Sequence, residues 1–251
     1  MSDTTQTSPQ TYARAAGITL LVILGCAIFS MMYVPSTLIV PGDAAATAAN
    51  IRASEPLFRM ALASDAILFL AEIVLTVLLY VLLKPVSKTL ALVATFARLA
   101  MTVMQGINVV VNFTALVLLG GAGYLTVFEP DQLNALVLVL FEAHTCGELV
   151  WGAFFGLHCV VLAWLIYKSG YFPRVLGILM AVAAFGYLAD SFGNLLSAGY
   201  DARFAWLVSV TGFAGEMPFF LWLLIKGVDV PKWHGRVAAS SPGTVPVQTR
   251  R

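Results

Sequence analysis

The sequence predicts an all-α integral membrane protein, a six-transmembrane-helix bundle with both termini in the cytoplasm. Three observations favour this fold. Of the 251 residues, 60% are hydrophobic and only 11% are charged, whereas a soluble domain carries about a quarter of its residues as charges. The apolar residues form six runs, each longer than the ~18 residues that indicate a spanning helix. The basic residues between these runs gather mainly on one side of the membrane.

The spans are expected at about 14–34, 57–83, 89–119, 131–167, 173–197 and 204–226. The first run is interpreted as a retained helix, because it has nearly the full ~20 residues of a bilayer crossing and no signal-peptidase motif follows it. The fourth run is too long for a hydrocarbon core of ~30 Å. We expect it to tilt, to project outward, or to break near Cys146 and Gly147.

The segments around the spans are predicted from charge and composition. Ten of the 14 Lys and Arg residues lie on the side of the two termini, which places that side in the cytoplasm. Residues 1–13 and the tail 229–251, which is rich in Pro, Ser, Gly and basic residues, are expected to be disordered. In the longest outer loop, Asp43 is expected to cap a short Ala-rich helix that runs through Asn50.

Four ionisable residues are predicted to lie near the middle of the membrane. Each is ten to twelve residues from the lysine that marks the cytoplasmic end of its helix, a depth of roughly 15–18 Å; they are Glu72, Arg98, His158 and Glu216. Because a charge at the bilayer centre costs at least ~2.5–3.5 kcal/mol, we expect Arg98 to form an ion pair with Glu72, Glu216 or both. The alternative is that this pair only fixes helix packing.

A second polar group is predicted nearer the outer surface, at roughly 24–30 Å from the inner face. It comprises Asp65, Gln105, Asn108, Glu148, Asp190 and Asn194. Together with the midplane residues it forms a predicted buried polar cluster that opens to the outer face. Asp65, Asp190 and Asn194 are expected to face a common pocket, with segment 41–50 as part of its lid.

Other sequence patterns carry weaker signals. His144, Glu148 and His158 are the candidate metal ligands, but only the i, i+4 spacing of the first two fits a metal site. We predict no cofactor. The GxxxG pair Gly152 and Gly156 is typical of close helix packing. The basic residues form no continuous face, which argues against a nucleic-acid partner.

Several stretches resemble an uncharacterised bacterial membrane family, domain of unknown function 4386. They are RAAGITLLVILGCAIFS, VPGDAAATAANIRASEPLFR, FFGLHCVVLAWLIYKSGYFPRVLGIL, GYLADSF, and GE followed by FLWLLIKGV. The resemblance covers about residues 13–228. It implies a multi-helix protein of the bacterial cytoplasmic membrane, with no activity or site assigned.

Three classes of function fit these patterns. The first is a binding or transport protein for a small polar or protonatable solute, since polar residues inside a membrane line ligand and proton paths. The second is an intramembrane hydrolase, metal-dependent or acid/base, acting on a lipid-like substrate. The third is a sensor or accessory subunit, which would act through a homo-oligomer or a partner membrane protein within the lipid bilayer.

Overall fold

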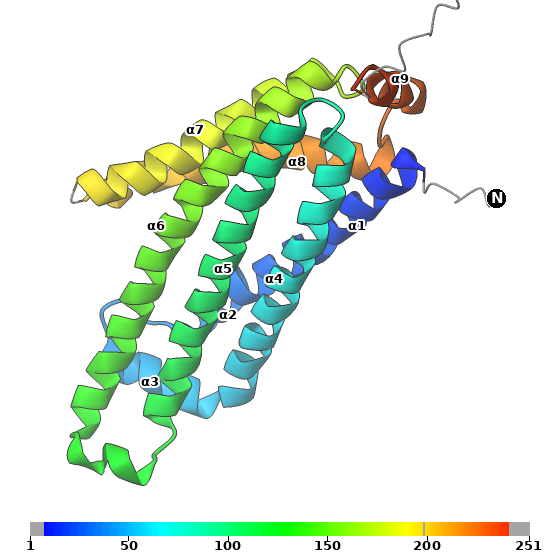
Figure 1. The fold of residues 1–251 in the computed structure, drawn as a ribbon. Helices are drawn as coiled ribbons and strands as arrows, with labels where there is room; N and C mark the ends of the chain where they lie inside the picture. The colour runs from blue at the N-terminus through cyan, green and yellow to red at the C-terminus, as the bar shows by residue number, and fades with distance from the viewer. Residues whose placement is uncertain (1–7, 198, 241–251) are drawn as a thin grey trace, which may run out of the picture.

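All regular elements in residues 8–197 and 199–240, the part of the chain that the computed structural model describes, are helices (Figure 1). Six helical segments are long and apolar enough to cross a membrane, which confirms the predicted number of spans. They are Pro9–Leu38, which combines α1 (Pro9–Ala27), η1 (Ile28–Tyr33) and α2 (Val34–Leu38), then α4 (Glu55–Leu83), α5 (Lys88–Leu119), α6 (Pro130–Ser169), α7 (Arg174–Leu196) and α8 (Asp201–Ile225). The shorter helices are α3 (Ala44–Ala53), η2 (Gly123–Val127) and α9 (Val230–Ser240).

The spanning helices form a ring in chain order. α1 packs against α4, α4 against α5, and so on to α8, which packs back against α1. One face of every helix therefore points into the space that the ring encloses. Polar side chains on these inner faces converge even though they are far apart in the sequence.

The connections between α4 and α5 and between α6 and α7 lie at the same end of the bundle as α9 and the start of α1 (Figure 1). We call this the basic end, because it carries Lys84, Lys88, Lys168 and Arg174. The opposite end, where α3 lies, is called the α3 end. The gathering of these basic residues at one end agrees with the predicted charge asymmetry.

The predicted disorder of the two ends needs a correction within the described residues. Helix α1 already begins at Pro9, and residues 230–240 form α9. Helix α9 is held against the bundle because the Trp233 indole donates a hydrogen bond to the carbonyl of Leu82 over 3.0 Å. The Tyr171 hydroxyl donates to the same carbonyl over 2.7 Å, and burial raises the pKa of this hydroxyl, so it stays protonated. Residues 1–7 and 241–251 lie outside the described residues.

Helix α6 does not break where the sequence suggested. It is continuous over 40 residues, or about 60 Å at 1.5 Å per residue, and it projects with α5 beyond α7 at the α3 end (Figure 1). A Cβ atom on Gly147 would lie 2.0 Å from the Asn108 side-chain oxygen. This glycine therefore makes room for a polar side chain of α5 and does not interrupt the helix.

Small residues allow close approach of α6 and α7. A Cβ on Gly152 would lie 2.7 Å from the Ser191 hydroxyl, and a Cβ on Gly156 would lie 2.7 Å from the Leu188 side chain. The interpretation of this GxxxG pair as a packing motif is confirmed. The capping prediction is confirmed as well, since the Asp43 carboxylate accepts a hydrogen bond from the Ala46 amide over 2.9 Å at the start of α3.

Candidate functional site

The predicted ion pair of Arg98 is present. Arg98 of α5 forms a salt bridge through Nη2 with the Oε2 atom of Glu72 on α4, and both residues are only 5% exposed. Among the two candidate carboxylates, Glu72 is the one in direct contact. Because Arg98 cannot lose its proton in a protein, this pairing compensates its charge where water has little access.

His158 of α6 extends the ion pair into a three-residue network, the Glu72–Arg98–His158 network. Its Nδ1 lies 2.8 Å from the Ala94 carbonyl, and its Nε2 lies 3.1 Å from Arg98 Nη1. A carbonyl can only accept, so Nδ1 carries the hydrogen. Nε2 then accepts from the guanidinium, which fixes His158 as a neutral imidazole with both nitrogens occupied.

Aromatic rings support this network from the side. The Phe155 ring stacks on the His158 ring at an interplanar angle of 10°, and the Arg98 guanidinium carbon lies 5.7 Å from the centre of the same ring. A cation over an aromatic face is stabilised when water is excluded. Phe155 therefore holds both the imidazole and the guanidinium in fixed positions.

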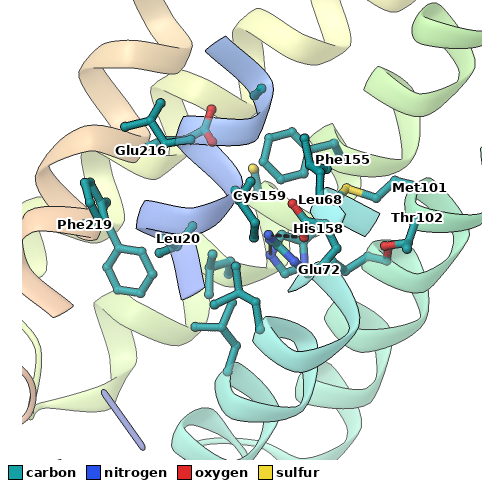
Figure 2. A pocket seen from close by; sticks show the side chains of 18 of the residues that line it. Leu20, Leu68, Glu72, Met101, Thr102, Phe155, His158, Cys159, Glu216 and Phe219 are labelled. Carbon is teal, nitrogen blue, oxygen red and sulfur yellow. Dashed lines mark hydrogen bonds and ion pairs between the residues drawn. The ribbon is translucent and has the colours of Figure 1, made fainter. Parts of the chain in front are cut away.

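The network faces a cavity of about 230 Å³ inside the ring of helices. All six spanning segments contribute to its wall, and most of the lining side chains are apolar. The polar lining consists mainly of the Glu72–Arg98–His158 network, Thr102, Gln105 and Glu216. Figure 2 shows Glu216 on α8, with Glu72 and His158 coming from other helices of the ring and facing the same space.

Glu216 is held by a residue that the sequence analysis missed. The Tyr187 hydroxyl of α7 donates a hydrogen bond to Glu216 Oε1 over 2.6 Å. The Tyr187 ring packs in a T-shaped arrangement against the rings of Trp151 and Phe155. A signal was available, because Tyr187 is 13 residues from Arg174, a depth of about 20 Å, and α7 is one of the two spanning segments to which no midplane residue had been assigned.

The predicted outer residues divide into separate groups. Gln105 lines the cavity, whereas Asp65, Asp190 and Asn194 do not belong to its wall. The carboxylates of Asp65 and Asp190 are close enough to Glu148 to interact electrostatically with it. Asn194 donates to the carbonyl and the carboxylate of Asp190 over 3.0 and 3.3 Å. Asp65 and Asn108 are buried. The outer pocket with segment 41–50 as its lid stays a prediction.

The candidate metal ligands are not assembled into a metal site. His144 Nδ1 lies 3.8 Å from Glu148 Oε1 on the same helix, while both nitrogens of His158 are used by Arg98 and Ala94. Within residues 8–197 and 199–240, no group of three His, Cys, Asp or Glu side chains is placed to hold a metal ion.

Comparison with known proteins places the chain in a family. Residues 15–227 match the family described as Domain of unknown function (DUF4386). The chain belongs to this family. A relative in Archaeoglobus fulgidus, an uncharacterised protein, is 29% identical over 161 residues, which cover 64% of this chain and 80% of the relative. No solved structure matches the DUF4386 chain.

Proposed function

We propose that this DUF4386 protein binds or transports a small protonatable solute in the cavity. The Glu216 carboxylate is the group that pairs with the positive charge of the solute. The observation that carries the proposal is the charge balance of the cavity wall. Glu72 and Arg98 neutralise each other, and His158 is neutral in its hydrogen-bonding pattern. Glu216 is the remaining carboxylate of the wall.

The surroundings of Glu216 fit a ligand that brings a proton or a positive charge. Across the described residues, no Lys, Arg or His nitrogen lies within 4 Å of its carboxylate. Tyr187 donates to Oε1, which leaves Oε2 for another donor. A protonated amine satisfies this oxygen with a charge-assisted hydrogen bond, which is stronger than a bond between neutral groups.

The same proposal gives the Glu72–Arg98–His158 network a positioning role and places Asp65, Gln105, Asn108, Glu148, Asp190 and Asn194 along a polar route toward the α3 end. Polar residues within spanning helices are costly and tend to mark such routes. We also propose that the basic end lies in the cytoplasm and the α3 end outside, because positively charged loops are retained on the cytoplasmic side.

The test is calorimetric titration of the purified protein in lipid nanodiscs with ethylamine, octylamine and octanoate. We expect at least one amine to bind, whereas octanoate should not. In Glu216→Gln, which keeps the acceptor of the Tyr187 hydroxyl but removes the charge, amine affinity should fall at least about tenfold, since a hydrogen bond to a charged group contributes about 1.5–3 kcal/mol.

The matched control is Glu142→Gln, which removes an exposed carboxylate of α6 that neither lines the cavity nor belongs to the proposed polar route. It should leave amine affinity unchanged. The proposal fails if neither amine binds, or if Glu216→Gln and Glu142→Gln have the same affinity for the amines.

A further inference from the structure

Four helices contribute a buried wall to the cavity, and the remaining part of the wall is accessible from outside the protein. With the exception of Trp151, the lining side chains from α4, α5, α6 and α7 are buried. The partly exposed lining residues belong mainly to α1, η1 and α8; they include Leu24, Ala27, Met31 and Met217, and Met31 is 37% exposed. The accessible part of the wall therefore lies where the ring closes, between the first and the last spanning helix.

The two helices meet at the basic end and separate toward the α3 end (Figure 1). Their tight contact is at Gly17, where a Cβ atom would lie 2.7 Å from the backbone of Leu224. Farther along α8, Phe213 is 68% exposed and Val210 is 57% exposed. This divergence leaves the side of the cavity uncovered at Met31 and Met217.

The depth and chemistry of this opening indicate what it faces. Met217 is nine residues from Lys226, or about 14 Å from the basic end, near the middle of a hydrocarbon core of ~30 Å. The rim residues Leu24, Ala27, Met31 and Met217 are apolar. A sideways opening at this depth meets lipid chains, and an apolar rim is compatible with that contact.

The first spanning segment has an unusual backbone at this rim. Ile28–Tyr33 is a π-helix, and the Ser30 hydroxyl donates to the Cys26 carbonyl over 2.9 Å. Ser64 of α4 donates to the same carbonyl over 3.4 Å. π-helical turns inside α-helices are frequently found at functional sites. Met31 lies within this turn and also lines the cavity.

We infer that the opening between α1–η1 and α8 is a lateral entrance from the bilayer, and that the ligand is an amphiphile with a protonated amine head and an apolar chain. This inference rests on the proposed role of Glu216. The amine would pair with Glu216, and the chain would occupy the apolar part of the cavity and the opening. A cavity below the range of roughly 300–1,000 Å³ typical of ligand pockets suits a chain that continues into the entrance.

The first test compares the two amines that probe the proposed function. Octylamine should bind at least about tenfold more tightly than ethylamine, because its chain buries additional apolar surface. In Ala27→Phe, which adds bulk at the rim, octylamine affinity or its association rate should fall at least about tenfold. Val22→Phe is the control, since Val22 is 43% exposed on α1 and does not line the cavity.

The second test measures what surrounds the entrance and does not depend on ligand binding. A nitroxide is attached at Met31→Cys after Cys26 and Cys146 are replaced by alanine, and collisions with oxygen and with a water-soluble nickel complex are measured by electron paramagnetic resonance in nanodiscs. The label at Met31 should collide more often with oxygen than with the nickel complex. A label at Ile18→Cys, on the exposed face of α1, should show the same preference, whereas a label at Lys232→Cys should collide more often with the nickel complex.

Two results would overturn the lateral entrance while leaving the proposed function in place. One is Glu216-dependent binding of ethylamine that equals or exceeds that of octylamine. The other is a label at Met31 that favours the nickel complex, which would show that the opening faces water. If instead neither amine binds, the proposed function itself is wrong.

Discussion

Replacing Arg98 by methionine should lower the free energy of unfolding by about 3–5 kcal/mol, because it leaves a buried carboxylate without its partner. Glu72 is 5% exposed, so water cannot take over the role of the guanidinium. His158 Nε2 loses its donor in the same variant. The measurement is unfolding in mixed micelles as the denaturing detergent is increased, followed by near-ultraviolet circular dichroism.

The structure provides a matched control for this prediction. Arg59 and Glu55 form an exposed ion pair whose side chains are 54% and 49% accessible. Arg59→Met should cost less than about 1 kcal/mol, because exposed pairs contribute little. The double variant Glu72→Leu with Arg98→Met removes both charges and should recover most of the lost stability. A single Arg98→Met variant as stable as Arg59→Met would contradict the account of the ion pair.

Replacing Gly17 by valine should destabilise the protein by about 1–3 kcal/mol or more, as overpacked contacts do. The new side chain would be placed against Leu224, with a Cβ only 2.7 Å from its Cα and amide nitrogen. Backbone atoms cannot rotate away as a side chain can, so α1 and α8 would have to separate. Because this contact closes the ring, the loss should appear both in thermal unfolding and as a smaller peak at the wild-type elution volume in size-exclusion chromatography.

The control for this second variant lies on the same helix. A Cβ on Gly25 would have no atom within 4 Å, so Gly25→Val adds the same side chain without a clash. It should unfold within about 0.5 kcal/mol of the wild type, as substitutions away from packed contacts usually do. If both valine variants are equally destabilised, helix propensity rather than the α1–α8 contact would explain the loss.

The level of the polar residues along the bundle could be predicted because the lysines mark one end of each helix and the rise per residue is fixed. That count put Glu72, Arg98, His158 and Glu216 at one level, and all four line the same cavity. It could not choose between Glu72 and Glu216 as the partner of Arg98, since depth does not determine how the helices are ordered around the ring. The choice became clear only from the packing of α4 against α5.

Other features depended on contacts that the sequence pattern does not display. Gly147 suggested a break in α6, but its role is to accommodate Asn108 from the neighbouring helix. The tail after residue 229 was interpreted from composition as disordered, whereas Trp233 anchors α9 to Leu82. The hydrogen bond of Tyr187 could not be predicted, because a tyrosine in an apolar run is typical of packing and its partner Glu216 lies on the next helix.

The most direct test of the central claim is mass spectrometry of the protein extracted together with its native lipid. Wild-type material should retain a small amine-bearing molecule, and the Glu216→Gln variant, purified in the same way and shown to be folded, should lose it. Glu142→Gln should retain it. The same bound species at the same occupancy in wild type and Glu216→Gln, or the absence of any amine from the wild type, would contradict the claim that Glu216 in the midplane cavity is a ligand site.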